Sequence, residues 1–143
     1  MKICFDTSVL VAAVVDQLPQ HEKALECFSA GFDKGVEACC SAHALAECYA
    51  TLTALPLPRR IQPMEAAELI KVNFSGRLKI LSIPKSAFMD SIARVSRLGL
   101  RSGVIYDALH LACAEASGCA TLYTYNLKDF RRLEPRDIKV VSP

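Results

Sequence analysis

The sequence contains no tryptophan, and aromatic residues make up only 7% of its 143 residues. A surface on which several aromatic rings stack RNA bases is therefore a poor expectation. A membrane helix needs about 20 apolar residues in a row, and no run in this sequence approaches that length. The glycine-rich loops of nucleotide sites, the G-x-S-x-G of esterases and the H-E-x-x-H of zinc peptidases are all missing. Dinucleotide, NTP, esterase and zinc-peptidase functions thus have no motif.

The seven cysteines form no C-x-x-C pair and no cysteine–histidine spacing typical of a zinc site. Their number is odd, and five of the seven lie inside apolar runs. Buried free thiols in a reducing compartment explain this pattern best. A redox role for the adjacent Cys39 and Cys40 is the alternative.

The first fifteen residues have some features of a signal peptide. Asp6 interrupts their apolar part, however, and no cleavage site of small residues follows Val15. We therefore expect this segment to be part of the folded protein, and the protein to be cytoplasmic.

The length and composition predict one folded domain over residues 1–143. Hydrophobic residues make up 52% of the chain, which excludes a disordered polymer. The formal net charge is only +2, but residues 1–72 hold six Lys/Arg against nine Asp/Glu, whereas residues 73–143 hold eleven against six. This asymmetry permits an acidic site in one part and a surface for polyanions in the other, and an ordinary mixed surface gives the same sums.

Short apolar segments alternate with longer segments of helical periodicity. Strands are predicted at residues 3–5, 36–40, 78–83, 120–124 and 138–141. Helices are predicted at 9–15, from Pro19 to Gly31 or Gly35, from Ser41 to about Leu55, from Pro63 to about Gly76, from Pro84 to Gly99, and at 104–117. Strands that are apolar throughout are typical of a parallel sheet with both faces covered. The sequence therefore predicts an α/β protein with three α/β/α layers and a mainly parallel central sheet.

Three carboxylates lie isolated in or beside apolar segments. Glu47 and Asp107 have no Lys or Arg three or four residues away, and Asp6 is the only charged residue between Lys2 and Asp16. Removing an ionised carboxylate from water costs several kcal/mol, as an order of magnitude, unless a partner compensates. Asp6 follows the first strand, and in a parallel sheet ligands bind beyond the carboxyl ends of the strands. If the first strand is central, all three carboxylates can meet at that edge, raise one another's pKa, and share a divalent cation such as Mg²⁺ or Mn²⁺.

Each carboxylate also has an ordinary structural explanation. Asp6 can cap a turn, Asp107 can complement a helix dipole, and Glu47 can bond to a buried hydroxyl or to an arginine elsewhere in the fold. The helix predicted from residue 9 can likewise be capped by Thr7 or Ser8. His43 and His110 are expected to be packed or hydrogen-bonded rather than catalytic, although His110 lies one turn after Asp107.

Four segments, in this order, resemble the motifs of the PIN-domain ribonuclease family. Asp6-Thr7-Ser8 after a short apolar strand resembles the opening of the family, and Ala46-Glu47 its second acidic position. The segment 106–112 resembles the third, and the segment 124–130 the last. The resemblance covers nearly the whole chain. Its length suits the small bacterial and archaeal members, particularly the VapC-type toxins of toxin–antitoxin pairs.

The resemblance implies a PIN-like fold and hydrolysis of RNA phosphodiester bonds with Mg²⁺ or Mn²⁺. It implies Asp6, Glu47 and Asp107 as metal ligands and as catalytic residues, with Asp129 as a fourth catalytic residue. The supporting residues are Thr7, Ser8, Thr124 and Asn126. Asn126 stands where many members carry an acidic residue, and Asp129 can supply the missing charge, so this departure weighs against a second strongly held metal ion.

Basic residues near these motifs suggest where RNA binds. Arg94, Arg97 and Arg101 recur at helical spacing, as a stripe along one helix face, and more follow the last motif. A basic stripe suits a phosphate backbone, and an ordinary solvated face has the same composition. The expected RNA-binding residues are Arg101, Lys128, Arg131 and Arg132.

The resemblance further implies a homodimer and a small antitoxin partner, with no membrane association. Two other functions stay open. One is a PIN-like module that binds RNA or a partner without cleaving. The other is a phosphohydrolase with Asp6 as nucleophile, although Ser8 occupies the second Asp place of the Asp-x-Asp-x-Thr start typical of the haloacid dehalogenases.

Overall fold

The computed structural model describes all residues from Met1 to Pro143. Its centre is a five-stranded sheet in the order β3-β2-β1-β4-β5, and every neighbouring pair of strands is parallel. The strands are β1 (Lys2–Phe5), β2 (Glu37–Ser41), β3 (Lys79–Leu81), β4 (Thr121–Tyr123) and β5 (Lys139–Val141). The predicted α/β class is confirmed, and β1 is the central strand.

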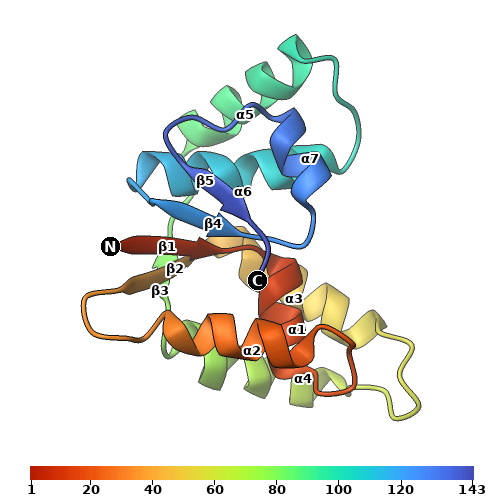
Figure 1. Ribbon diagram of the computed structural model, residues 1–143. Coiled ribbons are helices and arrows are strands. Elements are labelled where there is room, and N and C mark those ends of the chain that lie inside the picture. The colour runs from red at the N-terminus through yellow and green to blue at the C-terminus, as the bar shows by residue number, and fades with distance from the viewer.

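Helices cover both faces of this sheet (Figure 1). The helices are α1 (Thr7–Val14), α2 (His21–Ala30), α3 (Ala42–Ala54), α4 (Pro63–Ile70), α5 (Lys85–Arg97), α6 (Val104–Ala116) and α7 (Leu127–Arg132). A π-helical segment, Lys71–Ser75, extends α4. Figure 1 shows α1, α2 and α4 on one side of the sheet and α5, α6 and α7 on the other. None of the helices is long and apolar enough to span a membrane.

A separate hydrophobic core lies on each side of the sheet. Ile3 and Phe5 of β1 belong to the core beneath α1 to α4, whereas Cys4 belongs to the core beneath α5 to α7. This alternation follows from strand geometry, because successive side chains point to opposite faces. Cys39 and Cys40 are likewise divided between the two cores. All seven thiols are free, as expected, and the adjacent pair cannot act together.

Four details differ from the sequence prediction. The helix α7 was not predicted, because six residues with one buried apolar side chain, Phe130, carry little periodicity. Leu25, Phe88 and Ile92 were expected in buried helix stripes, but each is more than 40% exposed. The first helix begins at Thr7, and its cap is Asp6 rather than Thr7 or Ser8. The sheet has no antiparallel strand.

Candidate active site

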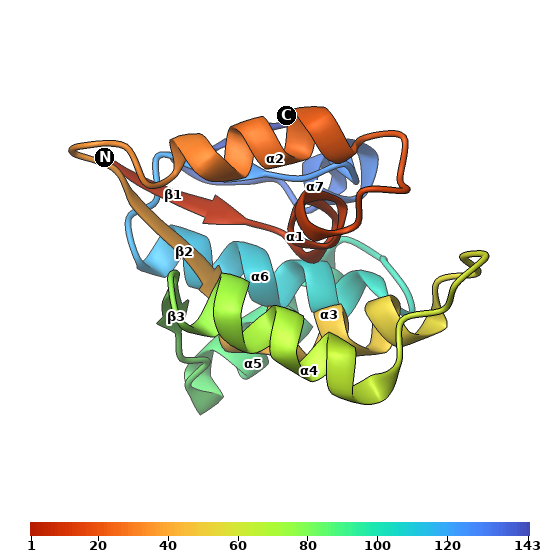
Figure 2. The ribbon, with the colours of Figure 1, turned by 90° about the horizontal axis from the view of Figure 1, so that it is seen from below.

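The carboxyl ends of β1, β2 and β4 form the edge that carries the predicted residues. Asp6 follows β1, Ser41 ends β2, and Thr124 follows β4. Because β1 lies between β2 and β4, these three residues come together although they are far apart in the sequence. Figure 2, seen from below, shows β1 pointing toward α1.

Asp6 is buried, with 2% of its surface exposed, and it is surrounded by hydrogen-bond donors. Its Oδ2 accepts hydrogen bonds from the hydroxyls of Ser8 and Thr124, both at 2.8 Å. The backbone N–H of Ser8 lies 3.4 Å away and caps α1 through the same oxygen. Asp6 therefore does cap a helix, and its second oxygen, Oδ1, faces the other site residues.

Thr124 and Ser8 also hold the last motif in place. The Ser8 hydroxyl accepts the backbone N–H of Tyr125 at 3.0 Å, and the Thr124 hydroxyl accepts that of Asn126 at 2.9 Å. Thr124 is completely buried. These bonds tie the segment after β4 to the segment after β1.

Glu47 projects from α3 and is held by two histidines. The Nε2 atom of His110 lies 2.7 Å from Glu47 Oε1, and Nε2 of His43 lies 3.1 Å from the same oxygen. The hydroxyl of Thr7 donates to Oε2 at 3.4 Å. The charge compensation that the sequence left open thus comes from histidine rather than from lysine or arginine.

His110 connects this group to the end of β2. Its ring is 2% exposed, and its Nδ1 lies 2.6 Å from the Ser41 hydroxyl. Its Nε2 also lies 4.0 Å from Asp6 Oδ1. One imidazole therefore stands between the carboxylates of Asp6 and Glu47. His43 stacks on Tyr106, with ring centroids 5.0 Å apart, on the outer side of the same group.

Asp107 and Glu47 have pKa values that are shifted in opposite directions. Burial raises the pKa of Asp107 to about 7, helped by the charges of Asp6, Asp129 and Glu47 and opposed by His110. Burial also raises the pKa of Glu47, but the hydrogen bond and charge of His110 outweigh it, and the pKa lies below its ordinary value. The expectation of raised pKa values is therefore wrong for Glu47.

His110 has the complementary shift. Burial lowers its pKa, but the hydrogen bond with Glu47 and the charges of Asp6, Glu47 and Asp107 raise it above the ordinary value overall. Glu47 and His110 thus stabilise each other's charged form. Asp107 keeps no such partner, so an excess of negative charge remains near it.

The oxygen donors at this edge suit a hard divalent cation, although they do not form a finished cage. No group of three or more His, Cys, Asp or Glu side chains is already arranged to hold a metal ion. Mg²⁺ usually keeps several waters and binds through one or two protein carboxylates together with substrate phosphates. The unbalanced charge that raises the pKa of Asp107 is what such an ion offsets. The donor set therefore fits Mg²⁺ or Mn²⁺ held partly through water.

Comparison with known proteins identifies the family. The family model described as the PIN domain matches residues 3–134. The chain belongs to the PIN-domain family. Ribonuclease VapC27 of Mycobacterium tuberculosis is 31% identical over 140 residues, covering 97% of this chain and 95% of that protein. Ribonuclease VapC40 of the same species is 33% identical over 136 residues, covering 94% of each. The family resemblance noted in the sequence is thus confirmed.

Solved structures share the PIN fold. The sarcin-ricin loop cleaving toxin VapC20 of M. tuberculosis superposes with a TM-score of 0.74 at 19% identity, covering 96% of this chain and 98% of that one. VapBC2 of Rickettsia felis, bound to a DNA fragment from its promoter, gives a TM-score of 0.70 at 20% identity, covering 100% of this chain and 99% of that one. At these identities the likeness establishes the fold.

In the last motif of this PIN domain, Asn126 and Asp129 differ in their connection to the other site residues. Asn126 is exposed, and its side chain makes no capping hydrogen bond to α7. Asp129 lies in the first turn of α7, and its charge acts on the pKa of Asp107. It also forms an ion pair at 3.3 Å with Arg132. Of the two residues, Asp129 is the one with an electrostatic connection to the other carboxylates.

The predicted basic stripe is not continuous. The helix α5 ends at Arg97, so Arg101 lies outside it. Arg94 is turned inward and forms an ion pair with Glu115 of α6 at 2.8 Å. Both side chains are largely buried, so Arg94 is not part of an exposed basic face. Among the expected RNA-binding residues, Arg132 is paired with Asp129, whereas Arg101, Lys128 and Arg131 form no ion pair and are exposed. The single helix stripe was therefore a wrong prediction.

The sequence interpretation expected His43 and His110 to be packed or hydrogen-bonded, kept only a minor role open for His110, and gave Ser41 no part in this site. His43 precedes Glu47 by four residues, which places both on one face of α3. His110 follows Asp107 by three residues but points toward Glu47 instead. The contact between His43 and Glu47 could have been predicted from their spacing of four residues. The contact between His110 and Glu47 depends on how α6 packs against α3 and β2.

Proposed function

We propose that this protein is a Mg²⁺- or Mn²⁺-dependent endoribonuclease and the toxin of a type II toxin–antitoxin pair. The observation that carries this proposal is the edge at which Asp6 and Glu47 flank His110 while Asp107 lies within reach of their charges. The VapC ribonucleases, which align with this chain over nearly its whole length, support the substrate class.

Asp6, Glu47 and Asp107 are the residues that hold the cation in this proposal, directly or through water. When bound, such an ion lowers the pKa of a water molecule and offsets charge on the phosphate oxygens. Ser8 and Thr124 fix Asp6 through two short hydrogen bonds, which leaves Oδ1 free to bind. Thr7 and His110 fix the Glu47 carboxylate, which we assign to orienting the attacking water.

The proposal is tested with purified protein and single-stranded RNA. Cleavage is expected with Mg²⁺ or Mn²⁺, and EDTA should stop it. RNA that is bound but never cut would favour the non-catalytic PIN-like module instead. Trapping of a phosphate ester on Asp6 would favour the phosphohydrolase.

Partners and location follow from the same assignment. VapBC structures from several bacteria are similar in fold to this chain, and we propose a small antitoxin and a homodimer here too. Three neighbouring apolar side chains of α5, Phe88, Met89 and Ile92, are 42–54% exposed and offer surface for such contacts. The seven free thiols fit the reducing cytoplasm.

Replacing Asp129 with asparagine is expected to lower RNA cleavage about 10- to 100-fold, the range typical of residues that support a metal site. The reason is its charge, which reaches Asp107. The matched change Asn126→Ala should leave cleavage within about twofold, because the exposed amide makes no hydrogen bond to the site. Measuring kcat/KM of both variants decides whether Asp129 or Asn126 occupies the fourth position of the site. Equal losses would mean that Asn126 shares the fourth position.

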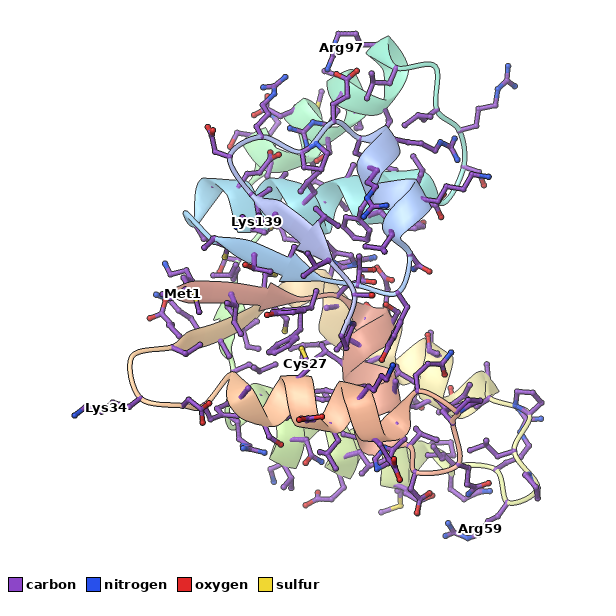
Figure 3. All side chains as sticks on the ribbon, in the orientation of Figure 1. Met1, Cys27, Lys34, Arg59, Arg97 and Lys139 are labelled. Atoms are coloured by element: carbon purple, nitrogen blue, oxygen red, sulfur yellow. The ribbon has the colours of Figure 1, made fainter.

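Replacing Lys128 and Arg131 together with alanine is expected to weaken RNA binding while leaving kcat unchanged. Both side chains are exposed and unpaired, beside the last motif. Figure 3 shows Arg97 at the far end of the half that contains α5 to α7 and Arg59 at the opposite end of the molecule. Lys128 and Arg131 belong to α7, in the same half of the molecule as Arg97.

The measurement is the slope of log affinity against log salt, which should become shallower by about 0.7 for each lost phosphate contact to single-stranded RNA. The exposed Lys34 lies on the other side of the sheet, so Lys34→Ala is the control and should leave the slope unchanged. An unchanged slope in the double variant would place the RNA elsewhere.

A further inference from the structure

His110 forms the shortest side-chain link between the elements of the site. Its Nε2 is 2.7 Å from Glu47 Oε1, and its Nδ1 is 2.6 Å from Ser41 Oγ. A carboxylate only accepts hydrogen bonds, so Nε2 carries a proton and donates it to Glu47. Each ring nitrogen thus has its own partner, and the ring cannot turn without breaking a hydrogen bond inside a buried space.

Ser41 is itself fixed. Its hydroxyl oxygen accepts the backbone N–H of Ala44 at 3.2 Å, which caps α3, and only 1% of the residue is exposed. The chain of contacts therefore runs from the end of β2 through Ser41 to His110 and on to Glu47. Its three members lie on β2, α6 and α3, which are regular secondary-structure elements rather than loops.

Glu47 needs such support because it is a long side chain on an accessible part of the site. Its side chain is 28% exposed, compared with 2% for Asp6. Asp6 is held by Ser8 and Thr124, whereas Glu47 has only a 3.4 Å hydrogen bond from Thr7 apart from its histidines. His43 contacts the same oxygen, but its own side chain is 28% exposed and no partner fixes its other nitrogen.

We propose that His110, oriented by Ser41, is the positioning residue that fixes the Glu47 carboxylate for metal binding and cleavage. This inference rests on the proposed function, because it assigns Glu47 to the cation site. His110 acts through Glu47 and touches neither RNA nor the reacting phosphate. The ring also separates Asp6 from Glu47 and so keeps the two carboxylates from closing onto each other.

Two variants of one residue test this inference. In His110→Gln the amide nitrogen lies near the place of Nε2 and can still donate to Glu47. In His110→Asn it lies near the place of Nδ1, so the contact with Ser41 can persist while Glu47 loses its donor. Both variants remove the ring. His21→Gln is the control, because the one hydrogen bond of the His21 ring is to the Ala12 carbonyl, at 2.9 Å, away from the site.

The first measurement is Mn²⁺ affinity of the metal-free proteins, by calorimetry, and the second is kcat and KM for RNA cleavage. His110→Asn is expected to lower Mn²⁺ affinity and kcat about 10- to 100-fold, with KM little changed. His110→Gln should recover most of both, and His21→Gln should match the wild type. If both His110 variants bind Mn²⁺ like the wild type, or are equally weak, the Nε2 donor plays no positioning part and the inference is wrong.

A wild type that neither binds Mn²⁺ nor cleaves RNA would instead overturn the proposed function. If His110→Asn does not fold, the wild type itself gives the answer through its ¹⁵N-labelled imidazoles. On titration with Mg²⁺ the Nε2 signal of His110 should shift while that of His21 stays constant. A bound Mg²⁺ that leaves the His110 signal unmoved would contradict the inference.

Discussion

The variant Asp6→Asn is expected to keep its fold and to lose cleavage of single-stranded RNA by at least about 100-fold in kcat/KM. Residues that only support a metal ligand are typically worth 10- to 100-fold, so a ligand itself should be worth at least as much. The fold should survive because asparagine caps helices as well as aspartate does. Its side-chain oxygen can still accept the hydrogen bonds of Ser8 and Thr124.

The control is Asp16→Asn, which makes the same chemical change at an exposed turn after α1. Cleavage by this variant should equal that of the wild type. Circular dichroism and the melting temperature establish that Asp6→Asn is folded. Cleavage that persists at wild-type rate in folded Asp6→Asn would show that the nuclease activity comes from another site or from a contaminant.

The variant Asp107→Asn is expected to be more stable than the wild type in metal-free buffer at pH 8. The pKa of Asp107 is raised to about 7 in the folded protein, chiefly by burial, from an ordinary value of 3.8. Between these values the folded state holds a proton that the unfolded state has released. The wild type therefore loses stability as the pH rises from about 4 to about 7. Asparagine has no charge to bury and escapes this loss.

The size of the effect is reduced by the partial exposure of Asp107, so we expect about 1–2 kcal/mol at pH 8 rather than the full 1.36 kcal/mol per pKa unit. That corresponds to a melting temperature about 3–8 °C higher. The difference should shrink toward zero near pH 4, and added Mg²⁺ should stabilise the wild type more than the variant.

Asp90→Asn is the matched control, since Asp90 is an exposed carboxylate of α5. Its melting temperature should stay within about 1 °C of the wild type, as is usual for surface changes. A variant Asp107→Asn that melts at or below the wild-type temperature at pH 8 would show that Asp107 is not an electrostatically strained residue.

The sheet was predictable from the sequence because its signals are local. Five short apolar segments, each followed by a turn or a helix start, gave all five strands to within two residues at either end. Ser41 was expected to cap the helix that follows, and it caps α3. The apolar face of α5 was predicted to be buried, but Phe88 and Ile92 are exposed. Periodicity shows that a helix has an apolar face and does not show what covers it.

The site was only partly predictable for the same reason. The sequence alone shows that Asp6, Glu47 and Asp107 are isolated charged residues in or beside apolar segments. The contact between His110 and Glu47 joins residues 63 positions apart, and nothing around either residue in the sequence indicates it. The helix α7, which carries Asp129, was missed because it is too short to show a period.

The bonds from Thr124 and Ser8 across the ends of β1 and β4 also bear on synthesis of the chain. One of the two hydroxyls that bind Asp6, that of Thr124, lies 118 residues later in the chain. A nascent or truncated polypeptide that stops before β4 therefore has only one of the two partners of its central strand, β2, and lacks a complete acidic edge. During synthesis, the complete acidic edge can therefore form only after β4 and Thr124 have been made.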